Sequence, residues 1–113
     1  RRTRLMKIPK TIDILGSIYQ VIQTLNIEED IKDIVPKSNH KDDDKEYLGY
    51  FDATQQKIWI NAKLKPRQQE RTLIHEVIEV LNVDLALNLS HDNIDRLEHG
   101  IYYTLTKNNF LKE

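Results

Sequence analysis

The sequence predicts an α+β fold, in which a small, mostly antiparallel sheet packs against two or three helices. Three observations predict it: β-branched and aromatic residues dominate several segments of the first half, apolar residues recur at helical spacing in the second half, and the chain has only 113 residues. A chain of this length forms one domain. We expect that domain to span residues 1–113, with residues 1–8 as a disordered or artificially added tail.

The first segments with regular patterns are a strand pair and a short helix. Residues 11–25 are rich in Ile, Val, Thr and Tyr, which favour strands, and Gly16–Ser17 in their middle is typical of a hairpin turn. Apolar residues in 26–37 follow a helical spacing, and Pro36 ends this short helix. The almost wholly polar residues 38–46 are expected to form a solvated loop.

A second hairpin and two long helices are predicted in the rest of the chain. Residues 47–52 and 57–61 should form an antiparallel hairpin, with 57–61 as an edge strand that could pair with an extended substrate. Pro66 suits the first turn of a helix that runs to about residue 84–88, and Ser90 can cap a last helix. Along that last helix, apolar residues recur at spacings of three and four: Ile94, Leu97, Ile101 and Leu105.

Composition and charge exclude several classes of protein. The 17 basic and 18 acidic residues give a net charge of −1, which argues against nucleic-acid binding through bulk positive charge. The chain has no cysteine, so a metal site would have to use His, Asp and Glu side chains. Apolar runs are at most two or three residues long, so we expect no membrane span. The lack of a secretory signal predicts a cytoplasmic protein.

The residues most informative about function are His75, Glu76 and Glu79, which form a His-Glu-x-x-Glu motif in the helix predicted from Pro66. Side chains four residues apart lie on the same helix face, so His75 and Glu79 could bind one metal ion. Glu76 is rotated by about 100° from His75. In the related His-Glu-x-x-His arrangement, this offset lets the Glu reach the metal-bound water without binding the metal. An exposed polar helix face would give the same pattern.

A catalytic zinc site takes three protein ligands and one open position, so a third ligand is expected near the motif. His91 lies at the predicted start of the last helix and would complete a set of two His and one carboxylate. Glu98 is the alternative third ligand, because it lies on the same helix face as His91, a face that Asp95 and Tyr102 share. His40 is expected to be solvated in the acidic loop.

The order of these segments resembles the small zincin-like metallopeptidases of phages and mobile elements, which are relatives of the ImmA/IrrE metallopeptidase group. The resemblance covers about residues 46–109 and is carried by three stretches: Trp59-Ile60-Asn61, Leu73-Ile74-His75-Glu76-x-x-Glu79 and Gly100-Ile101-Tyr102-Tyr103-x-Leu105. It implies a minimal zincin fold, with a small sheet, an active-site helix and a C-terminal helix that supplies the third ligand. It also implies that His75 binds zinc and that Glu76 is the general base. In that family the fifth motif position is usually His, and here it is Glu79.

Two functions from different classes follow, and a third stays open. The first is a zinc-dependent metallopeptidase, in which Glu76 deprotonates water for attack on a peptide bond. Its Zn²⁺ would be held by His75, Glu79 and His91, with Glu98 as the alternative third ligand. The second is a non-catalytic metal-binding regulatory or interaction protein of a phage or mobile element, with a peptide or protein partner. The missing second motif His favours it, whereas Glu76 favours the enzyme. The third is a helical interaction module without a metal, and the oligomeric state is left open.

Overall fold

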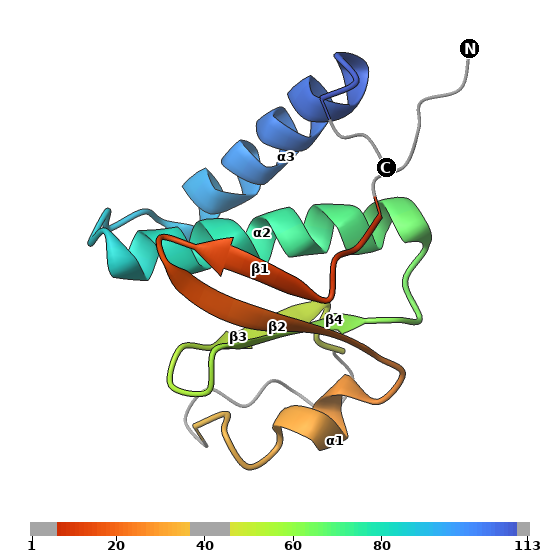
Figure 1. Cartoon of the computed structure of the whole chain (residues 1–113), viewed down its shortest axis with the longest axis vertical. Coiled ribbons are helices and arrows are strands. Elements are labelled where there is room, and N and C mark those ends of the chain that lie inside the picture. Colours follow the sequence, from red (N-terminus) through yellow and green to blue (C-terminus); the bar gives the residue numbers. More distant parts are fainter. Residues whose placement is uncertain (1–6, 37–45, 111–113) are drawn as a thin grey trace.

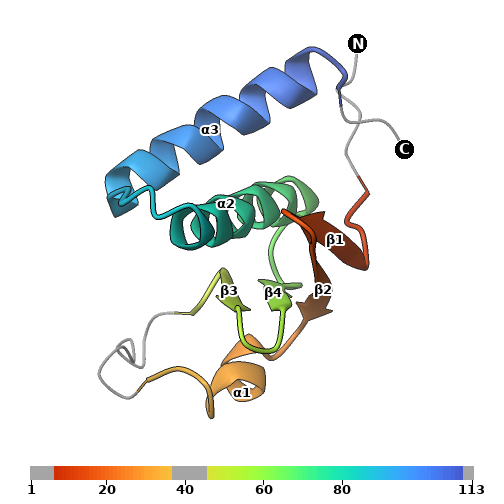
Figure 2. The same ribbon diagram turned by 60° about the vertical axis from the view of Figure 1, so that its left-hand side comes forward.

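The computed structural model describes residues 7–36 and 46–110 of the chain. The elements follow in the order β1 Thr11–Ile14, β2 Ser17–Thr24, α1 Ile27–Ile31, β3 Gly49–Asp52, β4 Lys57–Asn61, α2 Pro66–Asp84 and α3 His91–Lys107. Helix α2 covers one face of the sheet, α3 packs on the far side of α2, and α1 lies on the opposite face of the sheet (Figures 1 and 2). The α+β class predicted from the sequence is confirmed.

The sheet has four strands in the order β1-β2-β4-β3. Strands β1 and β2 form one antiparallel hairpin, β3 and β4 form another, and β2 pairs with β4 in parallel, for example Ile22 with Trp59. The prediction of an edge strand over 57–61 is therefore wrong, because β4 is interior and β3 is the edge. An interior place suits β4, because its apolar side chains are buried on both faces of the sheet.

The first hairpin turns at Leu15–Gly16, one residue earlier than the turn predicted at Gly16–Ser17. Both residues have positive φ, 53° at Leu15 and 90° at Gly16, which is the backbone of a tight two-residue turn between twisted strands. The N–H of Gly16 donates to Asp13 Oδ1 at 2.7 Å and closes the turn. This bond explains why the turn begins two residues after Asp13.

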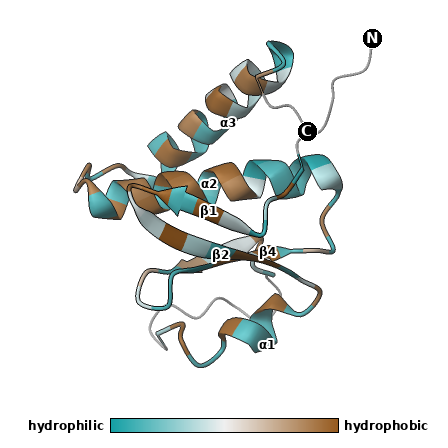
Figure 3. Cartoon of the chain, viewed as in Figure 1, coloured by the Kyte–Doolittle hydropathy of each residue, from teal (hydrophilic) through white to brown (hydrophobic). Residues whose placement is uncertain are grey.

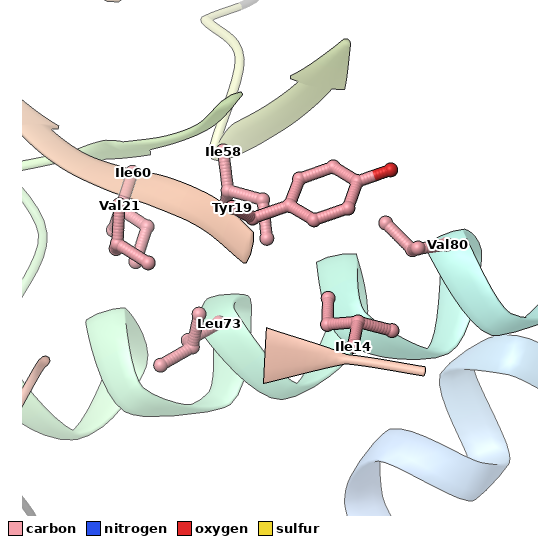
Figure 4. Close-up of a cluster of buried hydrophobic side chains, with 7 residues drawn as sticks. All are labelled: Ile14, Tyr19, Val21, Ile58, Ile60, Leu73 and Val80. Atoms are coloured by element: carbon pink, nitrogen blue, oxygen red, sulfur yellow. The ribbon is translucent and has the colours of Figure 1, made fainter. Parts of the chain in front are cut away.

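Two cores lie on opposite faces of the sheet. The larger lies between the sheet and α2 and consists of Ile14, Tyr19, Val21, Ile58, Ile60, Leu73 and Val80 (Figure 4), with Ile8 packed against it. The smaller lies under α1 and is built from Trp59 with Ile27, Ile31 and Val35. Neighbouring strand residues point to opposite faces, so β4 contributes to both cores.

The outermost helix, α3, contributes few residues to these cores. Ser90 caps it by accepting a hydrogen bond from the N–H of Asn93 at 3.1 Å, as the sequence predicts. Its buried residues are Ile94 and Thr106, and polar and apolar residues alternate along it (Figure 3). Within the described ranges, no helix combines the length and the apolar character needed to cross a membrane. Because few of its residues are buried, α3 is held in place by its contacts with α2.

Candidate functional site

The His-Glu-x-x-Glu motif lies in the middle of α2, on the side that faces α3. Leu73 and Val80 are buried against the sheet, and the helical period turns His75 and Glu79 about half a turn away from them. The side chain of His75 is only 20 % exposed, because α3 covers it. The pattern that builds the core therefore also places the motif between the two long helices.

Both ring nitrogens of His75 face carboxylates. Nδ1 lies 3.0 Å from Glu98 Oε1 and 3.5 Å from Asp95 Oδ1, both on α3. Nε2 lies 3.3 Å from Glu79 Oε2, one turn further along α2. A neutral imidazole has one N–H donor and one lone pair, so in that form one of its nitrogens would point a lone pair at a carboxylate. A cation bound at that nitrogen would replace this unfavourable contact between a lone pair and a carboxylate with attraction to both groups.

His75, Asp95 and Glu98 form a group that could hold a metal ion. One potential ligand atom from each lies within 4.8 Å of the others. Arg71 Nε donates to Glu98 Oε2 at 3.1 Å, which turns the other oxygen of Glu98 toward His75. Such an outer partner fixes the orientation of a carboxylate ligand. Asp95 is more open, with 64 % of its side chain exposed.

The structure divides the ligands predicted from the sequence into two sets. His75 and the alternative ligand Glu98 lie together, but Glu79 meets the other ring nitrogen of His75. His91, on the first turn of α3, is exposed and lines the same cleft without joining the group of three. Asp95 completes the group instead. The sequence signal for it was present, because Asp95 and Glu98 are three residues apart and share a helix face. His40 lies outside the described residues.

The group of His75, Asp95 and Glu98 borders a cleft of about 530 Å³. Its walls come from α2, from the first half of α3, and from Leu48 and Gly49 at the start of the edge strand β3. Glu76, the predicted general base, also lines this cleft and is only 6 % exposed. The metal-binding group and Glu76 are therefore accessible from one opening.

A second polar link joins the two long helices away from the cleft. The hydroxyl of Tyr102 donates to Glu70 Oε1, and Glu70 is 1 % exposed. Burial, followed by the hydrogen bond to Glu70, raises the pKa of Tyr102 to about 12. Tyr102 therefore remains a hydrogen-bond donor throughout the neutral range. Sequence reasoning missed Glu70, because nothing in its local pattern distinguishes it from a surface glutamate.

Comparisons with protein-family models, with curated proteins and with solved structures gave no match to this chain. The geometry of His75, Glu76 and their neighbours is thus the basis for any assignment of function.

Proposed function

We propose that this protein is a zinc-dependent hydrolase of peptide bonds, related to the zincin-like metallopeptidases. The observation that carries the proposal is the group formed by His75, Asp95 and Glu98, which lines the same cleft as the buried carboxylate of Glu76. A metal-binding group and a carboxylate outside it, at one opening, are the two parts that metal-assisted hydrolysis requires.

The donor atoms suit zinc. Zinc accepts imidazole nitrogen and carboxylate oxygen at about 2.0 Å, so tetrahedral ligand atoms are separated by roughly 3.3 Å. The separations from His75 Nδ1, 3.0 Å to Glu98 and 3.5 Å to Asp95, lie on either side of that value. Two carboxylates would neutralise the charge of the ion, and the guanidinium of Arg71 beside Glu98 offsets part of that effect.

The residues of the cleft have separate tasks in this reaction. A bound zinc ion would lower the pKa of water to near 7 and polarise the peptide carbonyl. Glu76 accepts a proton from the attacking water and passes it to the leaving amine, so that one peptide and one water give an acid and an amine. Arg71 holds Glu98 in orientation. Strand β3, the edge of the sheet beside the cleft, offers backbone groups to an extended peptide.

Elemental analysis of the purified protein, without a histidine tag, tests the metal. We expect about one divalent ion per chain after reconstitution with zinc and loss of that ion in His75→Ala. A wild-type protein that binds no metal in excess zinc would contradict the proposal. Peptide cleavage is then followed by mass spectrometry with a diverse peptide library, because the chemistry of the cleft does not select one sequence.

A second candidate function is favoured by the ion pairs of the same group. Arg71 pairs with Glu98, and a protonated His75 would pair with Glu98 and Glu79, so the group can also link α2 to α3 without a metal. In that case the chain is the third possibility that the sequence leaves open, a helical interaction module without a metal. It predicts no turnover and no zinc uptake.

A further inference from the structure

We propose that Gly49 is a positioning residue whose missing side chain sets the place of the Glu76 carboxylate. Gly49 begins the edge strand β3 and borders the cleft. A Cβ atom at this position would lie 3.0 Å from Glu76 Oε2, 2.6 Å from Thr72 Cγ2 and 3.1 Å from the carbonyl oxygen of Trp59. The catalytic consequence rests on the proposed function, whereas the position of the carboxylate does not.

The backbone conformation does not explain a glycine here. Among the described glycines, positive φ occurs at Gly16 and not at Gly49. A glycine within a strand costs about 0.5–1 kcal/mol relative to alanine through lost chain entropy. Close approach of β3 to α2 is the remaining reason, and it brings the backbone of β3 against two side chains one turn apart on α2, Thr72 and Glu76.

The neighbours of Gly49 differ in how easily they can move. The Trp59 carbonyl belongs to the interior strand β4 and is fixed by the sheet. Thr72 is held because its hydroxyl donates to the carbonyl of Gln68 at 2.8 Å, which fixes the direction of its methyl group. Glu76 Oε2 is the far end of a flexible side chain. A side chain at position 49 would therefore clash most closely with Thr72, and it would also push the Glu76 carboxylate away by a few tenths of an ångström.

This displacement would remove Glu76 from the place where it can accept a proton. The carboxylate lies beside the backbone of β3, and Glu76 as a whole is only 6 % exposed. A general base must lie within hydrogen-bond reach of the water that it deprotonates. Because a misplacement of about 1 Å can cost about 10²-fold in rate, a shift of a few tenths of an ångström should cost roughly three- to fivefold. Gly49 acts through Glu76 and has no contact with the reacting atoms in this scheme.

Gly49→Ala with and without Thr72→Ser separates positioning from packing. Serine at position 72 keeps the hydroxyl that bonds Gln68 and removes the methyl group that makes the closest contact. Thr72→Ser alone provides the baseline for both measurements. We expect the double variant to regain most of the stability that Gly49→Ala loses, with metal content unchanged. We expect its kcat to stay roughly three- to fivefold below the baseline, with KM nearly unchanged, because the contact with Glu76 persists.

Crystal structures of Gly49→Ala/Thr72→Ser and of Thr72→Ser give a readout that needs no turnover. We expect the Glu76 carboxylate to be displaced from β3 in the double variant only. An unmoved carboxylate, or a kcat restored to the baseline, would overturn the inference and leave Gly49 a packing residue. If the wild type cleaves no peptide and the carboxylate still moves, the proposed function fails while the positioning by Gly49 stands.

Discussion

At the scale of single residues, His75 is the side chain on which the candidate site depends, because carboxylates approach both of its ring nitrogens. The α3 carboxylates face Nδ1, whereas His91 lies outside the group. We therefore expect Glu98→Ala to weaken zinc affinity by at least about tenfold, and His91→Ala to weaken it by much less. Competition with a zinc-sensitive dye measures both. A larger loss in His91→Ala would restore the ligand set that the sequence predicts.

Glu79 provides the matched comparison within α2. It contacts Nε2 of His75, on the other side of the ring from Asp95 and Glu98. If the ion binds at Nδ1, the variant Glu79→Ala should retain most of the zinc affinity. If the ion binds at Nε2, Glu79→Ala should instead match His75→Ala, and the two α3 carboxylates would be outer partners.

Glu76 is the residue whose role separates an enzyme from a binding protein. Glutamine is nearly isosteric with glutamate but cannot accept a proton at neutral pH, so Glu76→Gln should keep the metal and lower turnover by about 10²–10⁴-fold. Peptide cleavage measured by mass spectrometry, with metal content measured on the same samples, checks this. Equal cleavage by both forms would reject Glu76 as the base.

At the scale of elements, the candidate site depends on the contact between α2 and α3. Two polar links hold these helices together: Arg71 and His75 to Glu98 at the cleft, and Glu70 to Tyr102 nearer the end of α3. The second link involves a buried carboxylate whose other oxygen, Oε2, has no hydrogen-bond partner within the described part of the chain. Glu70 is thus sensitive to the loss of the one bond that it receives from Tyr102.

We expect Tyr102→Phe to lower the free energy of unfolding by about 1–3 kcal/mol, because it leaves a buried carboxylate without its hydroxyl donor. The exposed neighbour Tyr103 provides the control, and Tyr103→Phe should change stability by no more than about 0.5 kcal/mol. Urea unfolding monitored by circular dichroism measures both. Equal stability of the two variants would show that the Glu70 link contributes nothing.

The hydrogen bond between Tyr102 and Glu70 also predicts how the free energy of unfolding changes with pH. The pKa of Tyr102 is raised from 10.0 to about 12, so the folded protein keeps this proton when the unfolded chain has lost it. The stabilisation is fully present below about pH 10 and is lost as the pH rises through about 12. The wild type should lose stability over this interval more steeply than Tyr102→Phe, as urea unfolding at several alkaline pH values would show.

At the scale of the whole molecule, the sequence predicted the elements better than their arrangement. The long helices were predictable because apolar spacing is local, and Pro66 and Ser90 mark where they begin. The parallel pairing of β2 with β4 was not predictable from the sequence. The alternation of Ile58 and Trp59 along β4 would be the same whichever strand lay beside it.

The group of His75, Asp95 and Glu98 was predictable only in part, because it combines a local motif with the arrangement of two helices. His75 follows from a local motif, but the turn of α3 that meets it depends on the connection between the helices. That connection uses positive φ at Ala86 and Asn88, and Asn82 Oδ1 accepts a hydrogen bond from the N–H of Leu89. No spacing rule gives the resulting position of α3, which brings Asp95 and Glu98 rather than His91 to the ring.

The group of His75, Asp95 and Glu98 links α2 to α3, so it predicts how zinc should affect the stability of the whole fold. An ion held by His75 on α2 and by Asp95 and Glu98 on α3 binds only the folded chain. Zinc at 100 times its Kd should therefore stabilise the protein by about 2.7 kcal/mol, and a chelator should reverse this. His75→Ala should show no such gain in thermal unfolding. If zinc leaves the Tm of the wild type unchanged, the group is a polar network that links the two helices without a metal.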